Sequence, residues 1–342
     1  MADPTETAPS EVASFEDLSL NPCLSRAVSK LGYERPTSVQ MQCIPLALEG
    51  KDVVARARTG SGKTAAYLLP VFHKILESTV PRGTFPRALI LVPTRELCQQ
   101  VRDEAVKILN GSGGTLRVEQ LPPTGSKPAE TRAVLGVRPD VLVATPGRFA
   151  TCLKDKLLQP DSLQKALQML VLDEADLLLS FGYEKDLNLI ATQVPPGCQV
   201  MLLSATMPEN VERLKQLVLH DPVVVEVDDE DGIGADDALA SAAGGITDVD
   251  AGPAQLVKHF TLDVAKAQEK LLYLLGLLRL NLVQRKVIIF VNTVDTGFRV
   301  KLFLEHFGVR CVVLNSELPS NSRVHILQEF NRGLQQMTRG TS

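Results

Sequence analysis

The stretch ARTGSGKT at residues 57–64 decides the fold of this chain. It fits the phosphate-loop pattern G-x-x-x-x-G-K-[ST], with Ala57 in place of the first glycine. An apolar run at 52–55 precedes the stretch and an amphipathic run at 64–77 follows it, which predicts a strand, a turn and a helix. Backbone N–H groups of residues 60–64 would then converge on a phosphate at the start of the helix. An ordinary glycine-rich turn is the alternative interpretation.

The last two residues of this stretch carry its chemistry. A lysine such as Lys63 places a positive charge near the β- and γ-phosphates of a nucleotide, and a hydroxyl such as that of Thr64 can bind Mg²⁺. The predicted phosphate-binding residues also include Arg58, Thr59, Gly60, Ser61 and Gly62. The expected ligands are therefore a nucleoside triphosphate and Mg²⁺.

Short apolar runs alternate with longer amphipathic runs over the first two thirds of the chain. They predict strands at 52–55, 88–92, 141–144, 169–172 and 200–203, and helices that include 64–77, 95–109 and 210–219. Strands that are apolar throughout and separated by helices are typical of a parallel sheet covered on both faces. The predicted fold class is α/β.

Three acidic residues follow the predicted strand at 169–172, in the sequence Asp173-Glu174-Ala175-Asp176. A parallel sheet presents its ligand-binding residues at the carboxyl ends of the strands. We expect Asp173 to bind Mg²⁺, partly through water, and Glu174 to orient or deprotonate an attacking water. Taken alone, these acids could instead complement the dipole of a following helix.

The composition narrows the class of protein. The 342 residues, of which 44% are hydrophobic, are enough to form two domains. The net charge is -4, so a basic surface for nucleic acid would have to be local. The six cysteines form no CxxC pair, which argues against zinc and a disulfide framework and for a reducing compartment. The amino-terminal residues lack a signal-peptide pattern, and no apolar run approaches the roughly 20 residues of a membrane span. We expect a protein that is neither secreted nor inserted in a membrane.

An acidic segment without Lys or Arg at 228–250 divides the chain. Its low apolar content predicts a disordered linker, either a solvated spacer or a docking segment. The predicted parts are a flexible tail at 1–14, a nucleotide-binding domain at 15–227, the linker at 228–254, a partial second domain at 255–334 and a tail at 335–342. In the second domain we predict strands at 259–264, 287–291 and 311–314 and helices at 269–280, 296–306 and 322–333. This domain is shorter than the roughly 150 residues typical of an α/β domain.

The phosphate loop, the acidic sequence at 173–176 and the triplet Ser204-Ala205-Thr206 together resemble the DEAD-box ATP-dependent RNA helicases. The resemblance extends from Phe15 to Leu334. It implies a RecA-like first domain and an incomplete second one, which bind ATP, Mg²⁺ and RNA and couple ATP hydrolysis to the opening of short duplexes. ARARTGSGKTAAY, LDEADLLLSFGYEKDL and the acidic segment further resemble a subgroup of nucleolar helicases involved in large ribosomal subunit assembly.

The sequence GYERPTSVQ at residues 32–40 resembles the adenine-recognition motif of this family. By this resemblance Gln40 would hydrogen-bond the adenine edge and Phe15 would stack on the ring. A buried amide selects one base because the wrong base leaves polar groups unpaired. Without the resemblance, Phe15 would be a core residue and Gln40 a solvated helix residue.

The resemblance also assigns residues that bind RNA and residues that couple ATP binding to domain closure. The backbone phosphates of RNA would be bound, without regard to base sequence, by Pro93, Thr94, Arg95, Thr145, Pro146, Gly147, Arg148 and, in the second domain, Arg323. Arg95 and Arg148 could instead form surface salt bridges. Asp176, Ser204 and Thr206 would link the nucleotide site to domain closure, although Ser204 and Thr206 could form an ST-turn.

The chain departs from the family pattern at three places. Only Gly125 stands where a glycine doublet is expected, and Ser320 stands in place of a glutamine. The later family motifs, including the arginine finger that contributes about 10³–10⁵ in rate, have no counterpart. We therefore expect a truncated form of the enzyme.

Two functions stay open at this point. The first is an ATP-dependent RNA helicase that acts on pre-ribosomal RNA in the nucleolus, with Lys63, Asp173 and Glu174 as catalytic residues. The second is a nucleotide- and RNA-binding fragment that is deficient in hydrolysis.

Overall fold

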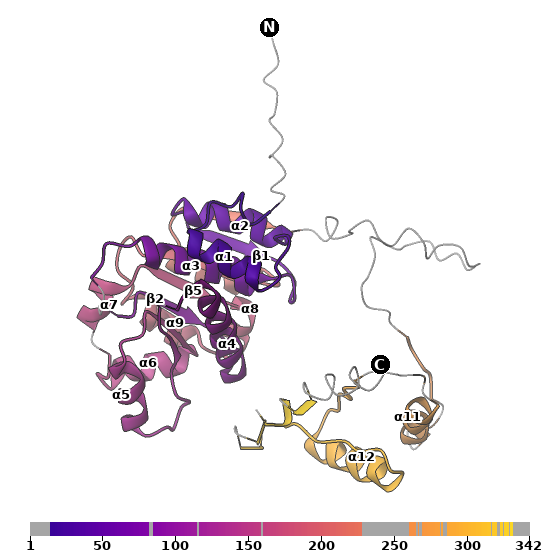
Figure 1. The fold of residues 1–342 in the computed structure, drawn as a ribbon. Helices are drawn as coiled ribbons and strands as arrows, with labels where there is room; N and C mark the ends of the chain where they lie inside the picture. The colour runs from indigo at the N-terminus through magenta and orange to yellow at the C-terminus, as the bar shows by residue number, and fades with distance from the viewer. Residues whose placement is uncertain are drawn as a thin grey trace. The chain divides into compact units, whose positions relative to one another are not determined.

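The computed structural model describes residues 14–81, 85–114, 116–158, 160–227, 260–264, 266, 269–280, 282, 286–315, 317–319, 322–323, 325–327 and 329–330. The predicted linker at 228–254, the predicted carboxyl-terminal tail at 335–342 and all but Ser14 of the predicted amino-terminal tail lie outside these residues. The chain divides into two compact units, Met1–Val249 and Asp250–Ser342. In Figure 1 the first unit runs from indigo to orange and the second from orange to yellow.

A seven-stranded sheet forms the centre of the first unit, and each of its pairings is parallel. Its strands are β1 (Val53–Arg56), β2 (Ala88–Leu91), β3 (Val118–Gln120), β4 (Val141–Ala144), β5 (Met169–Leu172), β6 (Gln199–Ser204) and β7 (Val223–Glu226). They lie in the order β3-β4-β2-β5-β6-β1-β7. The five predicted strands agree with the central five to within one residue at each end, whereas the edge strands β3 and β7 were not predicted.

Helices connect the strands of the first unit. They are α1 (Pro22–Lys30), α2 (Ser38–Leu48), α3 (Lys63–Glu77), α4 (Arg95–Ser112), α5 (Pro128–Gly136), α6 (Pro146–Lys154), α7 (Pro160–Ala166), α8 (Ala175–Ser180), α9 (Glu184–Ala191) and α10 (Glu209–Val218). No helix in the described part of the chain has the length and apolar character needed to span a membrane.

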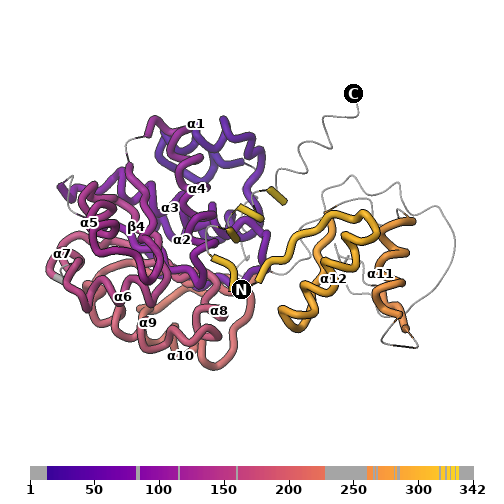
Figure 2. The backbone as a smooth tube through the Cα atoms, turned by 90° about the horizontal axis from the view of Figure 1, so that it is seen from below, coloured from indigo at the N-terminus to yellow at the C-terminus, as the bar shows by residue number. Residues whose placement is uncertain are grey.

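Alternate residues of each strand point to opposite faces of the sheet and enter different parts of the core. Val53 and Ala55 of β1 belong to a cluster with side chains of α1 to α4, whereas Val54 belongs to a cluster with side chains of α5 to α10. Figure 2 shows α1 to α4 on one side and α6 and α8 to α10 on the other. Because both faces are buried, the central strands are apolar throughout, which is why their sequences were recognisable.

The second unit contains α11 (Lys270–Arg279) and α12 (Val294–His306), close to the predicted helices at 269–280 and 296–306. The Cβ position of Gly297 on α12 would lie 3.3 Å from Val313 and 3.5 Å from Val291. The two apolar runs that precede and follow α12 therefore both pack against its start.

The strand prediction for the second unit is wrong for the described residues. Residues 260–264, 287–291 and 311–314 carry no strand assignment. A strand requires a hydrogen-bonded neighbour in register, and an apolar run does not specify that neighbour. Phe290 is 92% exposed in this unit, so a buried strand is not formed there. The predicted helix at 322–333 lies only partly within the described residues.

Candidate functional site

The loop between β1 and α3 adopts a turn that depends on two glycines. Gly60 has a φ of +83° and Gly62 a φ of +92°, a region that side chains with a Cβ rarely adopt. The Ser61 hydroxyl donates to the Arg58 carbonyl at 2.8 Å and closes the turn. The first N–H groups of α3 lack acceptors within the helix, so they can bind an anion at this end.

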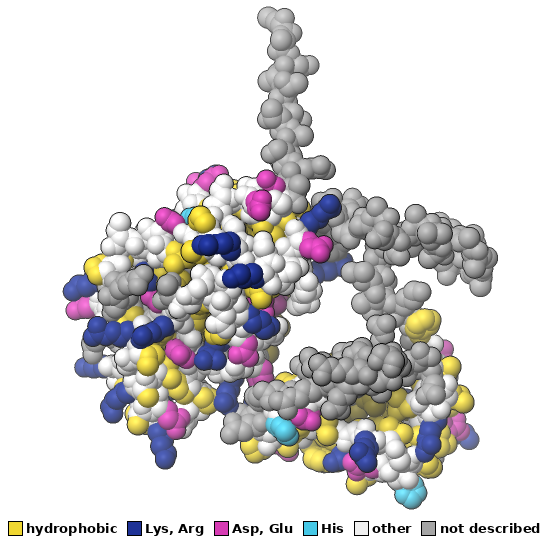
Figure 3. All heavy atoms as spheres, viewed as in Figure 1, with side chains coloured by type: hydrophobic (Ala, Val, Ile, Leu, Met, Phe, Trp, Pro, Cys, Tyr) yellow, Lys and Arg dark blue, Asp and Glu magenta, His cyan; other side chains and the backbone are white. Residues whose placement is uncertain are grey.

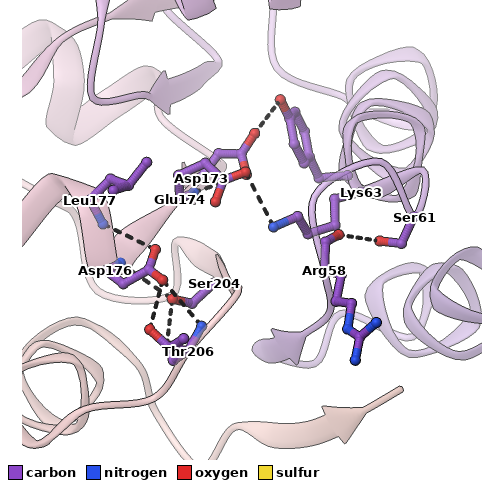
Figure 4. Close-up of polar contacts among 10 residues, drawn as sticks. Arg58, Ser61, Lys63, Asp173, Glu174, Asp176, Leu177, Ser204 and Thr206 are labelled. Carbon is purple, nitrogen blue, oxygen red and sulfur yellow. Dashed lines mark hydrogen bonds and ion pairs between the residues drawn. The ribbon is translucent and has the colours of Figure 1, made fainter. Parts of the chain in front are cut away.

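Lys63, the first residue of α3, contacts the predicted catalytic carboxylate. Its Nζ lies 3.3 Å from Oε1 of Glu174, and the two side chains are only 5% and 14% exposed. Glu174 follows Asp173 at the end of β5 and has a left-handed φ of 51°. Figure 4 shows Lys63 facing the Asp173–Glu174 pair across the site. A lysine and a glutamate that are far apart in sequence are thus paired in a largely buried position.

Asp173 is buried, and both of its carboxylate oxygens accept hydrogen bonds. Oδ1 accepts from the backbone N–H of Glu174 at 2.9 Å, and Oδ2 accepts from the Tyr67 hydroxyl at 3.0 Å. Burial, followed by the charge of Glu174, raises the pKa of Asp173 to about 6, although Lys63 opposes the rise. Burial therefore outweighs the opposing effect of Lys63 on this carboxyl.

The oxygen atoms at this position fit Mg²⁺. Asp173 contributes a carboxylate from the end of β5, and Thr64 contributes a hydroxyl from the first turn of α3. Hard oxygen donors of this kind are the ligands that Mg²⁺ prefers, and it commonly keeps several waters.

Tyr67 is a site residue that the sequence reasoning missed. It lies four residues after Lys63 on α3 and is completely buried. The signal that could have identified it is this spacing, because residues four apart share one face of a helix. A tyrosine hydroxyl on the same face as Lys63 would then be expected to approach the acidic loop.

Asp176, Ser204 and Thr206 join the loops that follow β5 and β6. Oδ2 of Asp176 accepts from the hydroxyl of Thr206 at 2.7 Å and from its backbone N–H at 3.1 Å. The Asp176 N–H donates to the Ser204 hydroxyl at 3.2 Å, which in turn donates to the Thr206 carbonyl at 2.6 Å. Figure 4 shows this cluster beside the Lys63–Glu174 pair. The contacts extend beyond a local ST-turn, because they link two strands.

A pocket of about 600 Å³ lies beside the phosphate loop. Its lining comprises Phe15, Gly32, Tyr33, Glu34, Arg35, Thr37, Gln40, Gly62, Thr64, Ala65, Gln100 and Glu104. Phe15 is buried, and its ring centroid lies 6.2 Å from that of Tyr33. The Tyr33 hydroxyl donates to Glu104 of α4. Phe15 is therefore both a core residue and part of the pocket wall, while Tyr33 and Glu104 were not predicted.

Gln40 connects this pocket to the phosphate loop. It is 6% exposed, which excludes the solvated position considered as an alternative. Its Oε1 accepts from the Thr37 N–H at 3.0 Å, and its Nε2 donates to the Gly62 carbonyl at 3.0 Å. A Cβ added to Gly62 would lie 2.6 Å from that Nε2. The amide thus joins the pocket to the phosphate loop.

The predicted RNA-binding residues of the first unit follow two neighbouring strands. Thr94 begins α4, where its hydroxyl accepts from the Leu97 N–H at 3.2 Å, with Pro93 buried before it and Arg95 half-buried after it. Thr145 stands before α6, which begins at Pro146. Because β2 and β4 are adjacent and parallel, both loops lie at the same edge of the sheet.

Arg148 points into the protein. It is 5% exposed, its Nε donates to the Pro122 carbonyl at 2.8 Å, and its guanidinium also donates to the Thr131 hydroxyl. This geometry excludes the surface salt bridge considered as an alternative. Arg148 fixes the ends of a segment that contains Gly125, the residue found where a glycine doublet was expected. At Gly147 a Cβ would lie 3.2 Å from the Tyr183 ring, so this turn packs closely against its neighbour.

Arg323 lies in the second unit, where its backbone N–H donates to the Pro319 carbonyl at 3.1 Å. Ser320 lies outside the described residues.

The strand order separates two groups of loops along one edge of the sheet. The predicted nucleotide loops follow β1, β5 and β6, whereas the predicted RNA loops follow β2 and β4 on the other half. In Figure 3, Lys and Arg side chains are interspersed with Asp and Glu over the visible face of the first unit. Any RNA contact would therefore depend on the local geometry of these loops more than on overall charge.

Comparison with protein families gives two matches. The DEAD/DEAH box helicase family matches residues 37–214, and the helicase conserved C-terminal domain matches residues 267–341. The first match contains β1 to β6 and the residues of the Lys63–Glu174 site.

Two named relatives illustrate the similarity. DEAD-box ATP-dependent RNA helicase 16 of Arabidopsis thaliana is 45% identical over 94% of this chain and 49% of the relative. ATP-dependent RNA helicase dbp9 of Schizosaccharomyces pombe is 42% identical over 95% of this chain and 50% of the relative. The chain spans about half the length of the curated relatives it matches.

Solved structures agree with the predicted fold class. A hypothetical ATP-dependent RNA helicase from Sulfolobus tokodaii is 30% identical with a TM-score of 0.53, covering 61% of this chain and 57% of that structure. A Saccharomyces cerevisiae Dbp5 variant bound to RNA and ADP–BeF3 is 24% identical with a TM-score of 0.73, covering 94% of this chain and 74% of that structure. The RecA-like α/β fold is confirmed.

Proposed function

The chain belongs to the DEAD/DEAH box helicase family, and from that premise we propose that it binds ATP and RNA and takes part in RNA-dependent ATP hydrolysis. Hydrolysis would be coupled to local unwinding or remodelling of duplexes. The observation that carries this proposal is the contact of Lys63 with Glu174, beside the buried Asp173, at the end of a glycine-dependent loop. These are the groups that phosphoryl transfer to water requires.

Each group has a role that follows from its position. Lys63 would leave Glu174 to bind the β- and γ-phosphates, while the N–H groups at the start of α3 bind further phosphate oxygens. Glu174 would then be free to orient or deprotonate the attacking water. Release of this one contact would therefore prepare both the phosphate-binding group and the base.

Thr64 and Asp173 would hold Mg²⁺, Asp173 partly through water. Mg²⁺ would neutralise charge that develops on the phosphates. This role is supported by the contacts of Asp173, whose two oxygens accept from the Glu174 N–H and the Tyr67 hydroxyl.

Adenine would occupy the pocket beside the loop, stacked on Phe15. Gln40 would hydrogen-bond the base edge, and its existing contact with the Gly62 carbonyl would link base recognition to the phosphate loop. The pocket volume of about 600 Å³ is in the range of small-molecule sites.

RNA would be bound through its backbone at the loops after β2 and β4, by Pro93, Thr94, Arg95, Thr145, Pro146 and Gly147. Arg323 of the second unit would also bind an RNA phosphate. Arg148 would act by fixing the segment between Pro122 and Thr131, because its guanidinium is bound there. The contacts of Asp176 with Ser204 and Thr206 would transmit the state of the nucleotide site to the loop after β6.

We further propose that 15–227 forms the ATP-binding domain, that 228–254 links it to a second helicase domain at 255–334, and that the protein acts on pre-ribosomal RNA in the nucleolus. The last point is supported by the subgroup resemblance of residues 55–67 and 172–187. Fluorescence microscopy of a tagged chain, followed by sequencing of crosslinked RNA, tests it. Cytoplasmic fluorescence without ribosomal RNA crosslinks would refute it.

The alternative is nucleotide and RNA binding without turnover. It is supported by the location of the Lys63, Asp173 and Gln40 contacts, all of which lie within the first unit. Binding by that unit would not require the second.

One set of measurements tests both functions on the 342-residue chain. ATP binding is measured by fluorescence with and without Mg²⁺, and phosphate release is measured with and without single-stranded RNA. RNA-stimulated release supports the helicase function. Binding of ATP and RNA without release supports the alternative, and absence of ATP binding refutes both.

A further inference from the structure

We propose that the Tyr67 hydroxyl is a positioning group that holds Asp173, a ligand of the proposed magnesium site, in its binding orientation. The inference rests on the nucleotide site proposed above. It adds a residue for which neither the phosphate-loop pattern nor the acidic motif accounts.

The helical spacing of α3 places Tyr67 at this site. Tyr67 follows Lys63 by four residues and Thr64 by three, so its side chain neighbours each of theirs on the helix surface. Lys63 Nζ lies 3.3 Å from Glu174 Oε1, and the Tyr67 hydroxyl lies 3.0 Å from Asp173 Oδ2. Two neighbouring side chains of α3 thus contact two consecutive carboxylates after β5.

The phenol makes a single directed contact with Asp173. A tyrosine hydroxyl has one hydrogen to donate. That hydrogen is donated to Asp173 Oδ2 at 3.0 Å. The contact ties α3 to the acidic loop after β5.

Burial makes this arrangement specific. Tyr67 is 0% exposed, so its hydroxyl has no bulk water to replace a lost partner. Burial raises the pKa of Tyr67 well above its ordinary value, so the hydroxyl remains a donor at neutral pH. The second oxygen of Asp173 accepts from the Glu174 N–H at 2.9 Å. Both oxygens of Asp173 are therefore fixed, and the orientation of the carboxylate is set before a metal binds.

Packing alone does not require the hydroxyl. A phenylalanine ring would fill the same space in the core among its buried neighbours. Tyr67→Phe therefore removes the hydrogen bond to Asp173 and leaves the ring, which makes it a sharp test of a positioning role.

The test measures the affinity of the 342-residue chain for a fluorescent ATP analogue, once with Mg²⁺ and once with excess EDTA. In Tyr67→Phe we expect unchanged affinity in EDTA and a loss of about tenfold in the Mg²⁺-dependent gain, the usual consequence of removing a group that orients a metal ligand. Equal losses in both conditions would overturn the proposal, because they would indicate a packing role. An unchanged Mg²⁺-dependent gain would also overturn it.

Two further variants make the result specific. Tyr33→Phe also removes a hydroxyl bonded to a carboxylate, that of Glu104, but outside the phosphate region; we expect any loss of affinity there to be the same with and without Mg²⁺. In an Asp173→Asn background, Tyr67→Phe should cost much less Mg²⁺-dependent affinity than in the unmodified chain, because the two residues act through one contact. Additive losses would contradict the proposal.

The proposed function and this inference fail in different ways. If the unmodified chain binds the analogue no better with Mg²⁺ than with EDTA, the magnesium site itself is refuted. If it shows that gain and Tyr67→Phe retains it, only the role of Tyr67 is refuted.

Discussion

Lys63 Nζ and Glu174 Oε1 lie 3.3 Å apart, within a largely buried ion pair. The residue proposed to bind phosphate is therefore already occupied by the residue proposed to activate water. On the proposed function, ATP would displace Glu174 from Lys63, and this exchange would tie phosphate binding to the release of the base.

Replacement of this carboxylate should strengthen nucleotide binding while it removes turnover. In Glu174→Gln the competing charge is lost, so we expect ATP to bind about threefold to tenfold more tightly, a gain of roughly 1 kcal/mol. Titration with a fluorescent analogue measures this. Glu212→Gln removes a carboxylate paired with Lys215 on α10, away from the site, and serves as the control. Weaker binding by Glu174→Gln would contradict the proposed exchange.

We expect substitution of Gly62 to lower the stability of the protein by more than backbone strain alone would. Gly62 and Gly50 both have a left-handed φ, +92° and +82°, but only at Gly62 does an added Cβ meet another atom, Gln40 Nε2 at 2.6 Å. We expect Gly50→Ala to cost about 1–2 kcal/mol of stability. Gly62→Ala should cost more and also abolish ATP binding, because the Gln40 amide must move. Thermal unfolding and analogue titration measure both effects, and equal destabilisation would contradict the argument.

The raised pKa of Asp173 predicts how stability depends on pH. Its folded value of about 6 exceeds the ordinary value of 3.8. The protonated carboxyl is therefore favoured in the folded state, and its stabilising contribution is complete below pH 3.8 and is lost as the pH rises through 6. Asp173→Asn removes the buried charge, so its gain in thermal midpoint should be larger at about pH 7.5 than at about pH 5.

The same comparison contains its own control. Any hydrogen bond that the Asp173→Asn substitution removes is lost at both pH values, so only the charge contributes to the difference. A shift in midpoint that is equal at the two pH values would show that the Asp173 carboxylate is not destabilised by burial.

We expect substitution of Arg148 to affect mainly stability and substitution of Arg95 to affect mainly RNA binding. Arg148 is buried and donates to the Pro122 carbonyl, so Arg148→Met should lower the thermal midpoint by several degrees. Arg95 is half-buried at the start of α4, and Arg95→Met should weaken RNA binding and reduce the salt dependence by about one phosphate contact, with little change in stability. Unfolding curves and RNA titrations at several salt concentrations separate the two. A reversed pattern would refute the assignment of Arg148 to an internal role.

The core of the first unit was predictable because its physical signals are local. The central strands are buried on both faces, so each appears as an uninterrupted apolar run. β3 lies at an edge and has the sequence VEQ, which lacks a continuous apolar run. β7 was missed although Val223, Val224 and Val225 form such a run, because the run is short and its strand lies at the other edge. In the second unit the apolar runs near Ile288 and Val312 were recognisable, but strand formation depends on pairing with another segment.

The site was predictable where a residue type has a fixed chemical use in a short motif, as for Lys63 and Asp173. It was harder to predict where a contact depends on a residue outside the motifs. Tyr67 was indicated only by its spacing from Lys63, and its bond to Asp173 appears once α3 and the loop after β5 are placed together. Arg148 showed its inward direction only through Pro122 and Thr131.

The single amide of Gln40 touches the phosphate turn through the Gly62 carbonyl while it faces the base pocket. A noncognate base that shifts this amide would therefore also disturb the turn that receives the phosphates. A noncognate nucleotide would then bind the pocket more weakly and would also have a misaligned triphosphate. A guanine nucleotide could therefore bind without placing its γ-phosphate for reaction.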